Sequence, residues 1–172
     1  MPDSSAFEAF TIILLRHGEE YLLLKRAPTK RIAPNRWTGV GGRVEPGEFA
    51  NIRASALREL REETGFSEAD IEHFTLRRAL LSGRPFEELY VLFYYTADLK
   101  EKSLPGCPEG QLLWIRPENF PTLDMMENSD SALGRIVMDM QRDPNGEEPV
   151  IYGFAVYETA GRWTKVVWGE SD

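Results

Sequence analysis

Cysteine and histidine are scarce in this sequence. Its 172 residues include one cysteine, Cys107, and two histidines, His17 and His73. One cysteine excludes a disulfide within the chain, and three such residues this far apart are too few for a structural zinc cluster. We therefore expect a protein of a reducing, cytoplasmic compartment that is stabilised by an ordinary hydrophobic core.

Long hydrophobic runs and a positive net charge are also missing. No apolar stretch approaches the roughly 20 residues that span a bilayer, and the first ten residues lack the features of a signal peptide. The formal net charge of −8 argues against binding to a nucleic-acid polymer or an acidic membrane. We expect a soluble monomer or homodimer whose partner is a small molecule. An anionic substrate would then need local positive charge, which metal ions can supply.

Hydrophobic patterning predicts one mixed α/β domain over residues 1–172. The predicted strands are Phe7–Leu15, Tyr21–Lys25, Arg36–Val40, Phe74–Leu81, Glu88–Ala97, Gln111–Ile115, Val150–Glu158 and Arg162–Trp168. The last two strands form a closing hairpin. The predicted helices are Ile52–Thr64, capped by Gly65, and Ser131–Arg142, started by Ser129 or Asp130.

The first predicted helix carries three carboxylates on one face. Glu59, Glu62 and Glu63 stand at positions i, i+3 and i+4, whereas Leu57 and Leu60 project to the other side. Like charges at these spacings cost an isolated helix about 0.2–0.5 kcal/mol per pair, which a bound divalent cation would reverse. The pattern therefore indicates either a metal site or an ordinary solvated acidic face.

The segments around these glutamates carry a recognisable motif. Gly41-Gly42-Arg43-Val44-Glu45-Pro46-Gly47-Glu48 precedes the helix, and Arg58-Glu59-Leu60-Arg61-Glu62-Glu63-Thr64-Gly65-Phe66 ends it. Together they resemble the Nudix box, and the sequence is identified as a member of the Nudix hydrolase family of the MutT-like type. Nine residues separate Glu48 from Arg58, whereas the family pattern has seven. We place the two extra residues in the loop 49–51 or in an earlier helix start, which leaves the role of Glu48 open.

The resemblance implies a fold and a chemistry. The fold is an α/β/α sandwich with a mixed central sheet and a C-terminal hairpin. The implied activity is metal-dependent hydrolysis of a phosphoanhydride bond, with magnesium or manganese held by oxygen ligands. These ligands would come from Gly41, Glu59, Glu62, Glu63 and Glu109. Arg58 would orient a box glutamate, and either Glu59, which we favour, or Glu109 would be the general base.

Resemblance outside the box indicates the kind of substrate. The chain looks similar to the branch that hydrolyses oxidised purine nucleoside triphosphates to monophosphate and pyrophosphate, an activity that serves nucleotide-pool sanitation. Arg43, in a basic stretch that runs from Lys25 to Val44 without an acidic residue, would contact a phosphate. Substrate-binding positions of that branch fall on Thr38, Met126, Asn128 and Ser129, where the branch keeps asparagine, tryptophan and two aspartates. Met126 could equally be a core residue.

Two other functions stay open at this level. One is hydrolysis of ADP-ribose or a dinucleoside polyphosphate, because the box fixes the bond type and leaves the attached groups undefined. The other is a nucleotide-sensing module that binds without cutting. All three box glutamates are present, which favours an enzyme over a sensor.

Overall fold

The fold is built on a mixed β-sheet. The computed structural model describes residues 7–83, 89–157 and 163–169. Within these ranges eight strands form one sheet in the order β3-β2-β1-β5-β4-β7-β8, and β6 also pairs with β2. The strands are β1 (Glu8–His17), β2 (Glu20–Arg26), β3 (Trp37–Thr38), β4 (Ile71–Gly83), β5 (Leu89–Leu99), β6 (Gly110–Ile115), β7 (Ile151–Tyr157) and β8 (Trp163–Trp168).

The sheet contains both parallel and antiparallel pairings. The pairs β1–β5 and β4–β7 are parallel, whereas β1–β2, β4–β5 and β7–β8 are antiparallel. The first two strands form a hairpin: His17 pairs with Glu20 across a turn in which Gly18 has φ 60°, a value that favours glycine. The predicted C-terminal hairpin is also present, although its turn at Thr159-Ala160-Gly161 lies outside the described residues.

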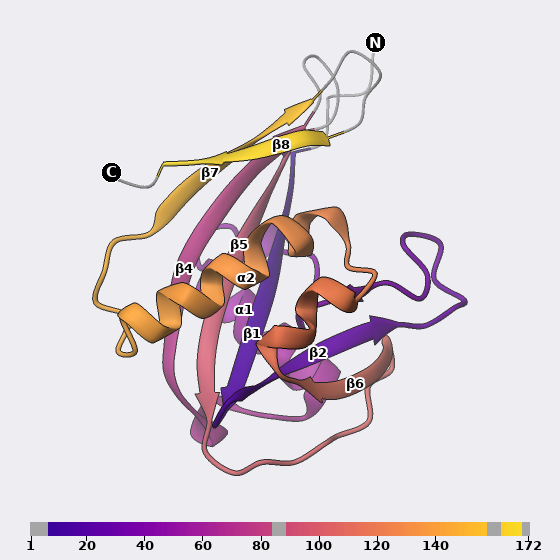
Figure 1. Ribbon diagram of the computed structural model, residues 1–172, viewed down its shortest axis with the longest axis vertical. Helices are drawn as coiled ribbons and strands as arrows, with labels where there is room; N and C mark the ends of the chain where they lie inside the picture. Colours follow the sequence, from indigo (N-terminus) through magenta and orange to yellow (C-terminus); the bar gives the residue numbers. More distant parts are fainter. Residues whose placement is uncertain (1–6, 84–88, 158–162, 170–172) are drawn as a thin grey trace.

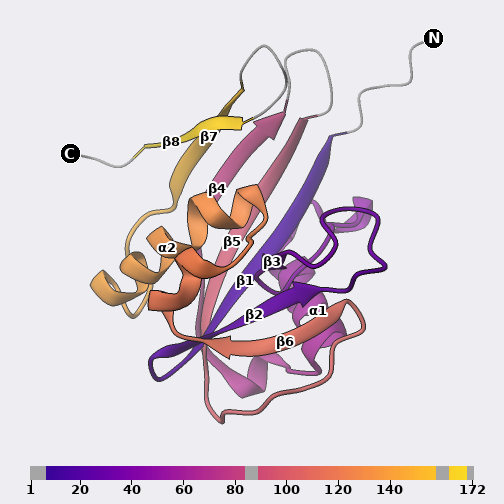
Figure 2. The same ribbon diagram turned by 45° about the vertical axis from the view of Figure 1, so that its right-hand side comes forward.

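One helix covers each face of this sheet. The helix α1 (Ile52–Thr64) lies behind the sheet and α2 (Glu127–Arg142) lies in front of it in Figure 1, and the rotated view in Figure 2 separates the two layers. Alternating residues of β1 belong to the hydrophobic cores on the two faces of the sheet. Ile12 and Leu14 pack toward α2, and Ile13 and Leu15 pack toward α1. The predicted α/β/α sandwich is confirmed. Within the described ranges, neither helix combines the length and apolar character needed to cross a bilayer.

The helix α1 begins and ends at the predicted residues because both of its ends are capped locally. The side chain of Asn51 accepts a hydrogen bond of 3.1 Å from the amide of Ala54. At the other end Gly65 adopts φ 76° and donates its amide to the carbonyl of Arg61. The short 3-10 helix Pro46–Glu48 and the turn after it precede Asn51, so the two extra residues lie in the loop.

The start of α2 was predicted wrongly. The helix begins at Glu127, after the N-cap residue Met126, and neither Ser129 nor Asp130 caps it. The amide of Met126 donates to the carbonyl of Trp37, a long-range contact that fixes the first turn. Ser129 is buried inside the helix instead of standing at its end.

Among the strands, β3 and β4 differ most from their predicted bounds. The strand β4 starts at Ile71, three residues before the predicted Phe74, because a register shift near His73, which has φ 53°, interrupts the alternation without ending the pairing. The strand β3 is limited to two residues, and Val40 forms only an isolated bridge with Ile13. The predicted start of β5 at Glu88 and the Arg84-Pro85 turn lie outside the described residues.

Candidate active site

A cavity of about 860 Å³ opens where the two layers meet at the segment 39–43. Such a volume accommodates a small organic ligand. Its wall combines residues of α1, the start of α2, β1, β5 and the loop after β2. The lining includes Phe10, Thr11, Leu24, Arg26, Thr38, Gly41, Gly42, Arg43, Glu59, Glu62, Glu63, Tyr90, Glu109, Met126, Glu127 and Asn128. All the site residues proposed from the sequence except Arg58 and Ser129 therefore line one cavity.

Glu63 is the most deeply buried acid of the site. Only 5% of it is exposed, and its Oε2 accepts a hydrogen bond of 2.8 Å from the amide of Gly41. Burial raises the pKa of Glu63 to about 8, and the nearby charges of Glu59 and Glu109 add to this effect against the opposing effect of the Gly41 amide. A cation bound beside this acid would oppose the effect of burial and favour the charged carboxylate.

Arg58 connects the other carboxylates of the site. Its Nε and Nη2 bind the two oxygens of Glu48 at 2.7 and 2.9 Å, and its Nη1 binds Glu59 at 2.7 Å and Glu62 at 2.9 Å. Its Nη2 also reaches the carbonyl of Arg43 at 3.0 Å. The guanidinium lowers the pKa of Glu48 to about 2. The first box glutamate thus reaches Arg58 in spite of the two extra residues between them.

The remaining acids differ in their surroundings. The side chain of Glu59 is 12% exposed and burial raises its pKa, whereas the side chain of Glu62 is 57% exposed. Glu109 forms an ion pair with Lys30 and lies close enough to raise the pKa of Glu63. Within residues 7–83, 89–157 and 163–169, no three acidic, histidine or cysteine side chains are gathered tightly enough to enclose an ion. The guanidinium of Arg58 instead lies among three of the acids.

The loop that carries Gly41 requires glycine. Gly41 has φ 146°, and a Cβ there would lie 2.0 Å from the carbonyl oxygen of Thr11. The amide of Thr11 in turn donates to the carbonyl of Gly42 at 2.9 Å. This close approach holds the loop against β1 and directs the Gly41 amide at Glu63.

The opposite end of the cavity is formed by the start of α2. The hydroxyls of Thr38 and Ser129 are buried and hydrogen-bond to each other at 2.8 Å. The Oδ1 of Asn128 accepts the amide of Ser129 at 2.8 Å, which leaves its NH₂ group as a donor. Met126 is half-buried in the cavity wall. This end therefore offers an amide donor and apolar surface.

Three lining residues were not singled out from the sequence. The rings of Phe10 and Tyr90 form an edge-to-face pair with centroids 6.3 Å apart. Arg26 donates its Nε to the carbonyl of Ile32 at 3.0 Å, forms no ion pair with an acid of the described chain, and lowers the pKa of Glu63 by its charge. By contrast, Arg43 pairs with Glu8 and its side chain is 63% exposed. The strand pattern could have placed the two rings on one face, but nothing local distinguishes Arg26 from its basic neighbours.

Comparisons with known proteins identify the family. The model of the NUDIX domain matches residues 7–135, and the chain belongs to this family. A Bacillus subtilis (strain 168) protein, provisionally described as an 8-oxo-dGTP diphosphatase, is 28% identical over 64% of this chain and 66% of its own length. The NAD-capped RNA hydrolase NudC of Stutzerimonas stutzeri (strain A1501) is 29% identical over 83% of this chain and 48% of its own length.

A solved structure supports the same fold. The crystal structure of a MutT protein from Bacillus halodurans superposes with a TM-score of 0.60 at 18% identity, covering 94% of this chain and 97% of that one. This chain spans about two thirds and one half of the lengths of the two curated relatives. The chain is thus a member of the Nudix family with a MutT-like fold, and members of this family generally use divalent metal cations.

Proposed function

We propose that this protein hydrolyses nucleoside triphosphates to nucleoside monophosphate and pyrophosphate in a magnesium-dependent reaction. The observation that carries the proposal is the position of Glu63, a buried carboxylate with a raised pKa that faces a ligand-sized cavity beside Glu59. Perturbed carboxylates in a cleft mark candidate catalytic sites. The provisional description of the Bacillus subtilis relative supports the choice of a triphosphate substrate.

The donor set fits a hard divalent cation. Glu59, Glu62, Glu63 and Glu109 offer carboxylate oxygens at the cavity wall, and Gly41 offers a backbone carbonyl. Burial raises the pKa of Glu63, and a cation bound beside this acid would favour its charged form. The chemistry that magnesium, or manganese in its place, supplies at such a site is neutralisation of phosphate oxygens and activation of water for in-line attack on phosphorus.

The protein side chains have separable tasks in this proposal. Glu59, whose pKa is raised by burial, accepts the proton from the attacking water; Glu109 is less suited because it is already paired with Lys30. Arg58 holds Glu59 by a hydrogen bond of 2.7 Å and so fixes its rotamer. Arg26, which has no acidic partner in the described chain, and Arg43 at the rim bind phosphate oxygens.

The end of the cavity near α2 receives the nucleoside. The hydroxyls of Thr38 and Ser129 hydrogen-bond to each other, so they present little unpaired hydrogen-bonding capacity to a base. Asn128 supplies a donor, and Met126 with the Phe10 and Tyr90 pair supplies apolar surface. This end binds a flat ring by shape with few directional contacts, so several bases are accepted.

A second candidate is hydrolysis of a dinucleotide pyrophosphate. The relative described as an NAD-capped RNA hydrolase aligns with 83% of this chain, and its substrate contains the same phosphoanhydride bond. The earlier alternatives of ADP-ribose and dinucleoside polyphosphates belong to this class. The site machinery would be unchanged, and only the leaving group would differ.

A substrate screen separates these candidates. Nucleoside triphosphates, NAD, ADP-ribose and dinucleoside polyphosphates are each incubated with the protein and magnesium, and the products are resolved by anion exchange. Pyrophosphate and nucleoside monophosphate as the main products support the proposal. If NAD is the only substrate cleaved, and gives nucleoside monophosphates, the result supports hydrolysis of a dinucleotide pyrophosphate. Parallel reactions in excess EDTA should be inactive until magnesium is restored. Full activity in excess chelator would contradict the proposed chemistry.

A further inference from the structure

Trp168, the last residue of β8, contacts two residues of the central sheet. Its ring meets the ring of Tyr94 edge-on, with centroids 6.4 Å apart at an interplanar angle of 69°. The guanidinium carbon of Arg78 lies 4.9 Å from its ring centroid. The hairpin that carries Trp168 lies beyond residues 7–135, the range matched by the family model. The hairpin therefore contributes an aromatic ring to the core beneath α2.

Gly153 provides the space in which the ring of Trp168 lies. The two residues are partners in the β7–β8 pairing, and a Cβ on Gly153 would lie 2.4 Å from Cε3 of Trp168. Gly153 does not have a positive φ, so its backbone would accept alanine and only the ring would have to move. The glycine consequently sets how closely Trp168 approaches the sheet.

Tyr94 connects this contact to the cavity. The residue is completely buried on β5, and its hydroxyl donates a hydrogen bond of 3.0 Å to the carbonyl oxygen of Asn128. Asn128 lies in the first turn of α2 and its side chain lines the cavity. Displacement of the Tyr94 ring would therefore shift the backbone that carries Asn128.

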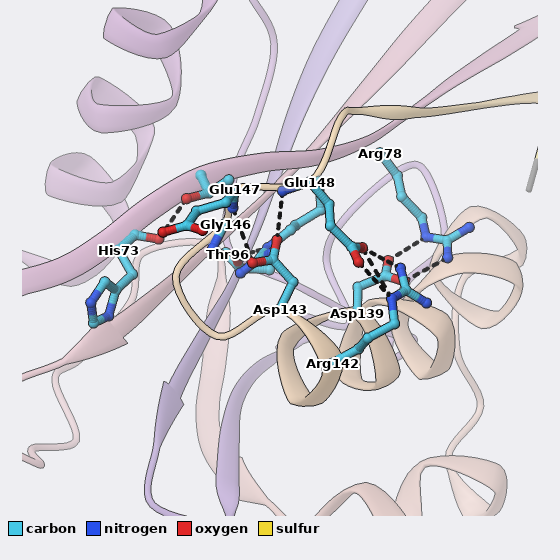
Figure 3. A network of polar contacts seen from close by, with 11 residues as sticks. His73, Arg78, Thr96, Asp139, Arg142, Asp143, Gly146, Glu147 and Glu148 are labelled. Carbon is cyan, nitrogen blue, oxygen red and sulfur yellow. Dashed lines mark hydrogen bonds and ion pairs between the residues drawn. The ribbon is translucent and has the colours of Figure 1, made fainter.

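Arg78 connects the same tryptophan to the C-terminal part of α2. Its Nε and Nη2 bind the two carboxylate oxygens of Asp139 at 2.6 and 2.9 Å, and both side chains are almost fully buried. Figure 3 shows this pair between β4 and α2, beside Arg142 and Glu148. Trp168 thus touches two residues that each hold α2, one near its first turn and one near its last turns.

We propose that Trp168 is a positioning residue for substrate recognition. Through Tyr94 the C-terminal hairpin sets the place of Asn128 in the cavity wall, and so controls binding of the nucleoside part of the substrate. The expected effect on substrate binding rests on the proposed function, because it is measured on an active enzyme. The contact route from Trp168 to Asn128 can be tested without it.

The test compares two glycine substitutions in the same hairpin. Gly153→Ala pushes the Trp168 ring, whereas Gly169→Ala meets only the carbonyl oxygen of Tyr152, at 3.4 Å, and serves as the matched control. For Gly153→Ala we expect KM for nucleoside triphosphates to rise about 5-fold, the scale of one neutral hydrogen bond, while kcat stays within about twofold because the carboxylates are untouched. The ratio of kcat/KM between purine and pyrimidine triphosphates should change as well.

A second variant and a second measurement test the same contacts independently. Tyr94→Phe retains the ring against Trp168 and removes only the hydroxyl, so it should raise KM in the same way even if Gly153→Ala fails to fold. The side-chain amide signal of Asn128 in an NMR spectrum should shift in Gly153→Ala and in Tyr94→Phe, and stay in place in Gly169→Ala.

The two proposals fail in different ways. A wild-type protein that is inactive on every nucleotide refutes the proposed function, and the Asn128 signal then decides the inference alone. An active wild type whose KM and Asn128 signal are unchanged by both variants overturns the positioning role. Equal changes in KM and in the Asn128 signal for Gly153→Ala and Gly169→Ala would also overturn the positioning role.

Discussion

Gly42 lies directly against the carboxylate of Glu59. A Cβ on Gly42 would be 2.6 Å from both Cδ and Oε2 of that glutamate. We expect Gly42→Ala to displace the carboxylate and lower kcat about 10²-fold, because misplacement of a catalytic group by about 1 Å has this effect. Gly47→Ala is the control, since a Cβ there meets nothing within 4 Å. Equal rates for the two variants would show that the position of Glu59 is unimportant.

Removal of charge from the acidic face tests the carboxylates themselves. Glu62→Gln and Glu63→Gln should each lower turnover by at least about 10²-fold, the scale on which positioned ionic groups act. Each variant should keep its circular dichroism spectrum, because glutamine has nearly the same shape as glutamate. Glu118→Gln, at an exposed position outside the cavity, should leave the rate unchanged. Near-normal turnover in both site variants would indicate a merely solvated helix face.

The raised pKa of Glu63 predicts how the metal-free protein responds to pH. Burial raises the pKa of Glu63 from its ordinary value of 4.5 to about 8 in the folded chain, so folding favours the protonated acid. This stabilisation is complete below about pH 4.5 and is lost as the pH rises toward about 8. At that pH the loss amounts to a few kcal/mol, since each unit of pKa shift corresponds to about 1.4 kcal/mol.

Glu63→Gln isolates this effect from other titrating groups. In EDTA the variant should be more thermostable than the wild type at pH 8 and similar to it near pH 4.5, as measured by calorimetry across the pH range. Magnesium should raise the Tm of the wild type more than that of the variant at pH 8. A difference in Tm that does not vary with pH would contradict the burial of an ionisable Glu63.

Base preference should be modest. The hydroxyls of Thr38 and Ser129 bind each other, so a purine edge meets Asn128 as the main directional donor among the residues aligned with the oxidised-purine branch. Shape alone discriminates by only about 1–3 kcal/mol. We expect kcat/KM for oxidised and ordinary guanine triphosphates to differ by less than roughly 100-fold, which corresponds to this energy range. Both values are measured at the same magnesium concentration. A much larger preference would mean that other residues select the base.

Local signals explain which parts of the fold were predictable. The helix α1 was predicted with its observed bounds because its hydrophobic spacing and its C-cap Gly65 are local signals in the sequence. The start of α2 depends on the backbone contact between Trp37 and Met126, which are far apart along the chain. No pattern within the helix reports such a contact.

The same distinction applies to the candidate site. Helical spacing placed Glu59, Glu62 and Glu63 on one face, but it could not reveal that Glu63 is buried while Glu62 is largely exposed. Their difference arises because the loop at Gly41 packs over one of them. Arg26 was missed because its lack of an acidic partner among the described residues is visible only in the folded chain.

The cavity takes its walls from both layers of the sandwich. The carboxylates come from α1 on one face of the sheet, whereas Asn128 and Met126 come from α2 on the other. The two groups share neither a helix nor a hydrophobic core. Substitutions at the start of α2 can therefore accumulate during evolution without disturbing the acids of α1, so that descendants of one ancestral hydrolase acquire new substrates while they keep the same bond-breaking chemistry.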